Sequence, residues 1–157
     1  MKSDKWKIYA FWIAISEAVG LVAGLLIRSG VDLYSQTVTK PPLSPPEWVF
    51  PVVWTLLYAL MGISAARIYL ADDTRQRQQS INLFIAQLAV NFFWPLFFFN
   101  LQAFGFALIW LLLLWVLVLL LILNSRKVDT VAAWLLLPYL IWLTFAVYLN
   151  TGVVLLN

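Results

Sequence analysis

Residues 104–123 read FGFALIWLLLLWVLVLLLIL, and this stretch alone indicates a membrane protein. A helix needs about 20 mostly apolar residues to cross the hydrocarbon core of a bilayer, at about 1.5 Å of rise per residue. The stretch has this length, carries no charge, and has no polar side-chain group except indole N–H. It predicts a membrane-spanning, lipid-facing helix, on which Trp110 and Trp115 face lipid or an interface.

Four further stretches have a similar length and composition. They cover residues 8–27, 48–70, 81–100 and 131–155. Asp, Lys and Arg are nearly absent inside them, as expected where each costs roughly 2.5–3.5 kcal/mol at the centre of a bilayer. The 157 residues are therefore predicted to form a single all-α membrane domain, a bundle of five transmembrane helices.

The overall composition excludes several other classes of protein. Hydrophobic residues make up 64% of the chain and charged residues only 11%, which is too apolar for a soluble domain of this size. The chain has no His and no Cys, which excludes zinc fingers, disulfides and haem held by either residue. We expect no metal site and no required cofactor. The basic residues are scattered over three loops, so the expected partner is the lipid bilayer and not nucleic acid.

The basic residues are distributed unevenly between the two sides of the predicted bundle. Five spans place the termini on opposite sides, and eight of the ten Lys and Arg residues fall on the N-terminal side. Such an excess of positive charge is typical of cytoplasmic loops. We predict a bacterial-type membrane protein with a cytoplasmic N-terminus and a C-terminus on the opposite side. The eight residues are Lys2, Lys5, Lys7, Arg67, Arg75, Arg77, Arg126 and Lys127, and the other side has Arg28 and Lys40.

One connection is much longer than the others. It covers residues 28–47, and its second half contains four prolines in the sequence KPPLSPPEW. Prolines favour extended or polyproline conformations and stop helix formation. Because long loops in compact proteins are often lids or binding loops, we expect a lid here. The connection at 101–103 is by contrast a tight turn, which makes its two flanking helices antiparallel neighbours.

Polar and aromatic side chains recur at helical spacing inside three of the spans. Members of each set lie three or four residues apart, so each set occupies one face of its helix. Three faces of indole, phenol and carboxamide predict either a shared cavity for a flat hydrophobic ligand or tight helix packing. The sets are Trp54, Tyr58, Met61 and Ala65; Gln87, Asn91, Trp94 and Phe98; and Tyr139, Trp142, Ala146, Leu149 and Asn150.

The first span contains two further candidates. Glu17 is the only carboxylate well inside a span, and an acid at this depth is a functional candidate that either carries a proton or faces a wet cavity. Gly20 and Gly24 form a G-x-x-x-G pattern, which permits the close approach of another helix. The approaching helix belongs either to the same bundle or to a second copy of the chain.

Three motifs together resemble those of a known family. They are KPPLSPPEWVFPVVWTLLYALMG at 40–62, AQLAVNFFWPLFFF at 86–99 and AWLLLPYLIWLTFAVYLN at 133–150. In this order they are similar to the translocator protein family, also called TspO/MBR, tryptophan-rich sensory proteins or peripheral-type benzodiazepine receptors. The resemblance runs from the first predicted helix to about residue 150.

The resemblance implies a five-helix bundle, often a homodimer, with a ligand pocket that opens toward the loop between the first two helices. Family members bind porphyrins such as protoporphyrin IX, benzodiazepine and isoquinoline carboxamide drugs, and in some cases sterols. The implied function is a membrane receptor for porphyrins with a role in tetrapyrrole regulation or stress signalling. The alternatives are a light-dependent porphyrin-degrading enzyme and a transporter of small hydrophobic molecules.

The resemblance also implies a set of site residues. If the protein is photochemically active, Trp54 and Trp142 are the implied catalytic residues, and porphyrin is the ligand and not a required cofactor. The implied ligand-binding residues are Trp54, Tyr58, Asn91, Trp94, Trp142, Ala146 and Leu149.

The sequence departs from the family pattern in the lid. Residues 33–34 read Leu-Tyr where the family usually has Trp-Tyr, and residues 40–43 read KPPL where the family has KP-x-W. A loop Trp that often lines the pocket is therefore missing, which weakens the expectation of drug binding and lid closure. After Tyr148 no Lys or Arg follows, so the proposed sterol motif is absent and no tight sterol binding is expected by this route.

Overall fold

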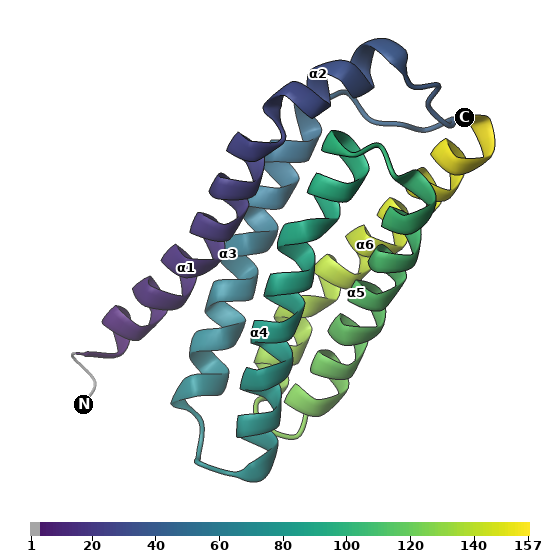
Figure 1. The fold of residues 1–157 in the computed structure, drawn as a ribbon. Helices are drawn as coiled ribbons and strands as arrows, with labels where there is room; N and C mark the ends of the chain where they lie inside the picture. Colours follow the sequence, from purple (N-terminus) through teal and green to yellow (C-terminus); the bar gives the residue numbers. More distant parts are fainter. Residues whose placement is uncertain (1–3) are drawn as a thin grey trace.

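The computed structural model describes residues 4–157, and within this range the chain forms helices and no strand (Figure 1). Five helices are long and apolar enough to cross a membrane, which confirms the predicted fold class. These spans are α1 (Lys5–Leu26), α3 (Val49–Leu70), α4 (Arg75–Pro95) with its π-helical continuation η2 (Leu96–Asn100), α5 (Phe104–Ser125) and α6 (Thr130–Leu156).

The predicted lid is partly helical, which its proline-rich sequence did not indicate. A sixth helix, α2 (Arg28–Thr37), comes after α1 and the single residue Ile27. The prolines begin only at residue 41, so they end the helical segment without preventing it. Gly30 of α2 lies so close to the Phe99 backbone that a Cβ atom there would collide with it. This close approach holds α2 against η2 at one end of the bundle.

The long helices pack side by side in the ring order α1, α3, α6, α5, α4 (Figure 1). α4 and α5 are antiparallel neighbours, as the tight turn predicted, and the Ala103 N–H donates to the Phe97 carbonyl within that turn at 3.0 Å. The least buried span is α1 and not α5, since α1 packs mainly on α3. α5 is held between two neighbours, but exposed apolar side chains such as Ile109 and Leu113 leave it a lipid-facing surface, as expected.

The two tryptophans of α5 show how it is held. The indole N–H of Trp110 donates to the Val90 carbonyl of α4 at 2.8 Å. The indole N–H of Trp115 donates to the Thr144 hydroxyl of α6 at 2.9 Å. Interhelical hydrogen bonds of this kind contribute about 0.6 kcal/mol on average in membrane proteins. Both residues therefore join helices in addition to covering the surface of α5.

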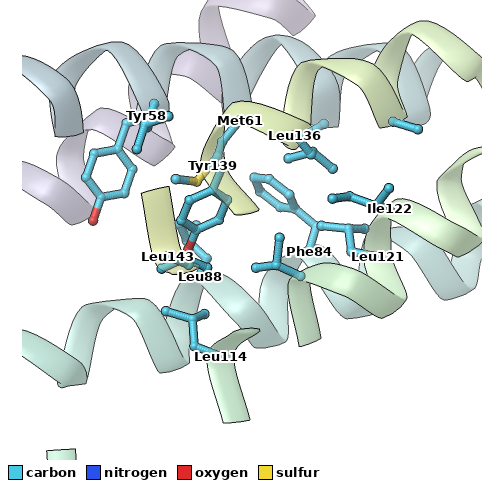
Figure 2. Close-up of a cluster of buried hydrophobic side chains, with 14 of the residues drawn as sticks. Tyr58, Met61, Phe84, Leu88, Leu114, Leu121, Ile122, Leu136, Tyr139 and Leu143 are labelled. Atoms are coloured by element: carbon cyan, nitrogen blue, oxygen red, sulfur yellow. The ribbon is translucent and has the colours of Figure 1, made fainter. Parts of the chain in front are cut away.

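Apolar side chains fill the half of the bundle that is far from α2, and Figure 2 shows the buried cluster to which they belong. Met61, Phe84, Leu121 and Leu136 come from four different helices and are completely or almost completely buried. In a bilayer such residues hold helices together by close van der Waals packing, because lipid is as apolar as they are. The bundle is consequently solid at this end.

α1 and α3 cross closely at Gly62. A Cβ atom at Gly62 would collide with the backbone of Ile13, so only glycine permits this approach.

The two glycines of the predicted G-x-x-x-G pattern have different surroundings. Gly20 packs against the ring of Tyr58 within the bundle, whereas a Cβ atom at Gly24 would meet nothing within 4 Å.

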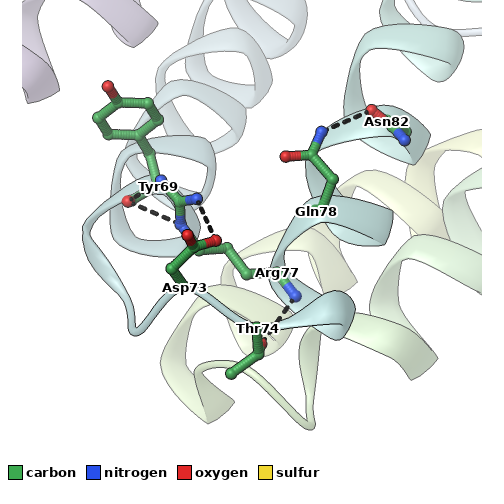
Figure 3. A network of polar contacts seen from close by, with 6 residues as sticks. All are labelled: Tyr69, Asp73, Thr74, Arg77, Gln78 and Asn82. Atoms are coloured by element: carbon green, nitrogen blue, oxygen red, sulfur yellow. Dashed lines mark hydrogen bonds and ion pairs between the residues drawn. The ribbon is translucent and has the colours of Figure 1, made fainter.

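The turn between α3 and α4 is fixed by Arg77 (Figure 3). Its guanidinium donates to the Tyr69 carbonyl at 2.7 and 3.0 Å and lies 3.5 Å from the Asp73 carboxylate. Thr74 caps α4, because its hydroxyl accepts the Arg77 backbone N–H at 3.2 Å. The turn therefore satisfies its own polar groups at the end of the bundle opposite α2.

The starts of α1, α4 and α6 lie at the same end of the bundle as this turn, together with the ends of α3 and α5 (Figure 1). Seven of the eight basic residues assigned to the N-terminal side belong to these helix ends and turns. The eighth, Lys2, lies outside the described residues. Arg28 and Lys40 lie at the opposite end, in α2 and the segment after it.

Arg67 and Asp129 connect α3 to the start of α6. The Arg67 guanidinium lies 3.1 Å from each carboxylate oxygen of Asp129, and the same carboxylate accepts the Ala132 N–H at 2.9 Å. Burial by itself raises the pKa of the Asp129 carboxyl, but the hydrogen bonds from Ala132 and Arg67 outweigh it and hold the pKa below its ordinary value. The carboxylate is both a helix cap and half of an ion pair.

Asp129→Ala is expected to lower the free energy of unfolding by about 1–2 kcal/mol at pH 7, because it removes an N-cap. The pKa of the Asp129 carboxyl is lower in the folded than in the unfolded protein. The stabilisation that its carboxylate provides is therefore present above about pH 4, and it is lost as the pH falls through the folded pKa. Unfolding in SDS, monitored by circular dichroism from pH 7 downward, measures it. Asp129→Asn keeps the cap and serves as control, and equal stability of wild type and Asp129→Ala at pH 7 would contradict the assignment.

Candidate ligand-binding site

A cavity of about 1110 Å³ lies in the half of the bundle nearest α2. Its volume is at the upper end of the range of about 300–1,000 Å³ that is typical of small-molecule sites. All seven residues predicted to bind a ligand line this one cavity. They are Trp54 and Tyr58 from α3, Asn91 and Trp94 from α4, and Trp142, Ala146 and Leu149 from α6.

Aromatic rings form much of the wall. The Trp54 and Trp142 rings meet edge to face, with 6.5 Å between their centroids, and the Tyr58 ring lies 5.6 Å from that of Trp54. On the opposite wall, Trp94 and Phe98 stack with centroids 5.0 Å apart. Rings packed on one another in this way are held in place before any ligand arrives, and they suit the face of another aromatic system.

Some members of the predicted faces lie outside the cavity. Met61, Ala65, Gln87 and Tyr139 are fully or almost fully buried, and none of them lines it. The helical faces were therefore identified correctly, but each face continues past the cavity into the packed half of the bundle. Helical spacing gives the direction in which a side chain points and does not give the depth at which the cavity ends.

A chain of hydrogen bonds forms the floor of the cavity. The Tyr58 hydroxyl donates to Asn91 Oδ1 at 2.5 Å, and Asn91 Nδ2 donates to the Tyr139 hydroxyl at 2.5 Å. The Tyr139 hydroxyl in turn donates to Gln87 Oε1 at 2.9 Å. These buried groups satisfy one another across α3, α4 and α6, which makes the network rigid. The hydroxyl of Tyr58 and the amide of Asn91 are thus already bonded within the protein.

Trp142 differs from Trp94 in its hydrogen bonding. The Trp94 indole N–H donates to Asn150 Oδ1 at 3.1 Å, and Asn150 Nδ2 donates to the Phe104 carbonyl at 3.0 Å. The Trp142 indole N–H is buried but has no acceptor among residues 4–157. A buried donor without a partner costs about 1–3 kcal/mol. Trp142 therefore holds a free hydrogen-bond donor beside the cavity.

The ligand-binding residues expected from the sequence include none from α1, α2 or α5, although all three helices contribute to the wall. Leu111 and Leu114 of α5 line the cavity, but they lie in an unbroken apolar run that gives no periodic signal. On α1 the spacing of Gly20 and Gly24 was noticed, and both residues line the cavity. Glu17 lines it as well, which agrees with one of the two alternatives for an acid at this depth, that it faces a cavity.

The cavity is closed on three sides and more open on the fourth. Every lining residue from α4, η2, α5 and α6 is buried or half-buried. The exposed lining residues all come from α1, from α2, and from residues 47–55, which include the start of α3. They are Ala14, Ala18, Leu21, Gly24, Leu25, Arg28, Asp32, Glu47, Trp48, Pro51 and Thr55.

Residues 38–48, after α2, are fastened to the end of α6. The Asn157 side chain donates to the Thr39 carbonyl at 2.9 Å and accepts the Thr39 N–H at 3.0 Å. The Tyr148 hydroxyl donates to the Pro42 carbonyl at 2.6 Å. Leu43, which stands where the resembled pattern has a Trp, is 81% exposed and does not line the cavity. The lid is therefore held by α6 without that Trp.

Known proteins resemble the chain over nearly its whole length. The sequence model of the TspO/MBR family matches residues 12–156. The tryptophan-rich protein TspO of Chlorobaculum tepidum is 35% identical over 150 residues, which cover 94% of each chain. The tryptophan-rich sensory protein of Cereibacter sphaeroides is 33% identical over 152 residues, which cover 97% of this chain and 92% of that protein. The translocator protein of Homo sapiens is 37% identical over 144 residues, which cover 90% of this chain and 85% of that protein. With its five apolar spans, the chain belongs to the TspO/MBR family of membrane proteins.

Proposed function

We propose that the protein is an integral membrane receptor for porphyrins, such as protoporphyrin IX, and for other flat aromatic molecules. The observation that carries this proposal is the cavity of about 1110 Å³ walled by Trp54, Trp142 and Trp94. A porphyrin is a broad, flat π-system, and stacking on indole faces is the strongest interaction such a wall offers.

The packed half of the bundle favours a receptor over a transporter. The Tyr58–Asn91–Tyr139 chain closes the cavity below, and the apolar cluster around Phe84 and Leu136 fills the space beyond it (Figure 2). Within residues 4–157, these packed groups block a ligand that enters from the α2 end from passing to the other end. Binding and subsequent signalling through a partner or through the lid require no such path.

The rim of the cavity offers two cations to the carboxylates of natural porphyrins, although Asp32 and Glu47 balance their charge. Arg28 lines the cavity where α2 begins, and Lys40 lies in the segment that covers it. We place this rim on the side opposite the cytoplasm, because seven of the described basic residues gather at the other end of the bundle. A porphyrin would then bind with its apolar edge toward the floor and its carboxylates toward these two cations.

Quenching of tryptophan fluorescence by protoporphyrin IX tests the proposal. Saturable quenching with one porphyrin per chain is expected for the wild type in lipid nanodiscs. Trp54→Phe with Trp142→Phe removes two indoles of the wall and is expected to remove most of the saturable component. Trp6→Phe with Trp134→Phe is the matched control, since both residues are about two-thirds exposed at the other end of the bundle. Quenching that never saturates, or that is identical in both double variants, would reject the proposal.

The hydrogen bond between Tyr148 and the lid predicts a kinetic effect. Tyr148→Phe removes the bond to the Pro42 carbonyl, which is worth about 0.5–1.5 kcal/mol. Release of protoporphyrin IX is expected to become roughly 2–10-fold faster, because the lid opens more readily. Stopped-flow recovery of tryptophan fluorescence measures the rate. The control is Thr37→Ala, which removes a hydroxyl that is bonded only within α2. An unchanged release rate in Tyr148→Phe would show that this hydrogen bond does not hold a lid over the cavity.

Light-dependent oxidation of a bound porphyrin is the second candidate function. It is favoured by the edge-to-face pair of Trp54 and Trp142, because indoles are readily oxidised and both rings line the cavity. Illumination of the complex should bleach the porphyrin absorbance faster than illumination of porphyrin in detergent with free tryptophan. Equal bleaching rates would reject catalysis and leave the receptor function intact.

A further inference from the structure

Glu17 lies on the cavity wall and has no hydrogen-bond or ion-pair partner among residues 4–157. It is on α1, nine residues before the end of that helix, which corresponds to about 14 Å along the axis. None of the four ion pairs found within residues 4–157 includes its carboxylate, and no side-chain hydrogen bond in that range does. An unpaired acid at this depth of a spanning helix is rare and costly unless something compensates it.

The neighbours of Glu17 do not compensate its charge. Tyr58, the ring that packs against α1 at Gly20, gives its hydroxyl hydrogen to Asn91 and not to the carboxylate. The rings of Tyr58 and Trp54 instead present π-systems to the same cavity. A carboxylate beside aromatic faces is an arrangement that attracts a positive charge, through Coulomb attraction and through the ring quadrupoles.

The other charges of the site cancel at its rim. Asp32, Glu47 and Arg28 line the outer part of the cavity, and Lys40 lies 3.8 Å from the Glu47 carboxylate. Two acids and two bases leave this rim without net charge. An ionised Glu17 therefore sets the net charge of the cavity, and it lies below the rim on the wall that α1 contributes.

We propose that Glu17 makes the deep part of the cavity a subsite for a cationic nitrogen. The ligand class that fits best is then an aromatic molecule with a protonated amine, its ring system on the tryptophans and its ammonium on the carboxylate. This inference rests on the proposed function, since it assumes that the cavity binds an aromatic ligand. It also sets the direction of a porphyrin, because the carboxylates of a porphyrin would be repelled by Glu17 and must face the rim.

Two dansyl probes that differ only in charge test the inference. Dansylcadaverine carries a protonated amine at pH 7, and its N-acetyl derivative has nearly the same shape without the charge. Binding is monitored by dansyl fluorescence in phosphatidylcholine nanodiscs, with empty nanodiscs subtracted. The wild type is expected to bind the cationic probe about tenfold more tightly, which is 1.4 kcal/mol. In Glu17→Gln the two affinities should agree within about twofold, with the neutral probe bound as in the wild type.

Glu47→Gln provides the matched control, because it removes an acid of the same kind from the rim and should leave the tenfold preference in place. Equal affinities of the two probes for the wild type would overturn the inference, and so would a preference that survives in Glu17→Gln. In both of these results the neutral probe still binds, so the proposed function stands. If neither probe binds and protoporphyrin IX does not quench saturably, the proposed function fails together with the inference.

Discussion

Gly62→Leu is expected to separate α1 from α3 and to lower the free energy of unfolding by about 2–3 kcal/mol. A Cβ atom at this position would collide with the backbone of Ile13, which has no side-chain rotation available to avoid it. Overpacking of this kind typically costs about 1–3 kcal/mol, and the larger values arise where the neighbour cannot move. Because α1 packs mainly on α3, it has little other contact with which to remain in place.

Unfolding in SDS, monitored by circular dichroism, measures the effect of Gly62→Leu. The matched control is Gly24→Leu, since a Cβ atom at Gly24 would meet nothing within 4 Å. This control is expected to change the free energy of unfolding by no more than about 0.5 kcal/mol. Equal changes in the two variants would mean that the crossing at Gly62 does not hold α1 on the bundle.

Ala146→Trp is expected to weaken the binding of protoporphyrin IX at least about 100-fold, or 2.7 kcal/mol, by filling the cavity. Ala146 is buried on α6 and lines the cavity, so a larger side chain there extends into space that the ligand needs. The fold should persist, because that space is empty in the protein. Overpacking in the solid half of the bundle, at Leu136 for example, would by contrast disrupt the helix contacts themselves.

Ile141→Trp is the matched control for this variant. Ile141 lies on the same helix, is 63% exposed and does not line the cavity, so the added indole faces outward. Titration of tryptophan fluorescence in nanodiscs should give an affinity within about twofold of the wild type for Ile141→Trp. An affinity of Ala146→Trp that also stays within twofold would show that the porphyrin binds elsewhere.

The architecture of the bundle can be predicted closely from the sequence. Five apolar runs of about 20 residues can be satisfied in lipid only by five helices, since every backbone polar group must be bonded within its own segment. The helical period then indicates which side chains share a face. It correctly groups Trp54 with Tyr58, Asn91 with Trp94, and Trp142 with Ala146, and all six line one cavity.

Other features depend on tertiary contacts that no local pattern reveals. α2 forms although its segment was expected to be extended, because the prolines constrain the backbone only from residue 41 onward. The crossing at Gly62 lies among small residues of α3, and the sequence around a single glycine does not indicate which helix packs against it. Contacts between distant segments, such as Asn157 with Thr39, have no sequence signal at all. Tyr139 was placed on the right face, but its burial below the cavity depends on packing from three helices.

Native mass spectrometry most directly tests the central claim that the aromatic cavity holds one porphyrin. The wild type, mixed with protoporphyrin IX and released from detergent micelles, is expected to carry one porphyrin mass per chain. This adduct should persist in Ile141→Trp and disappear in Ala146→Trp. A wild type without the adduct, or an equal adduct in Ala146→Trp, would contradict the claim.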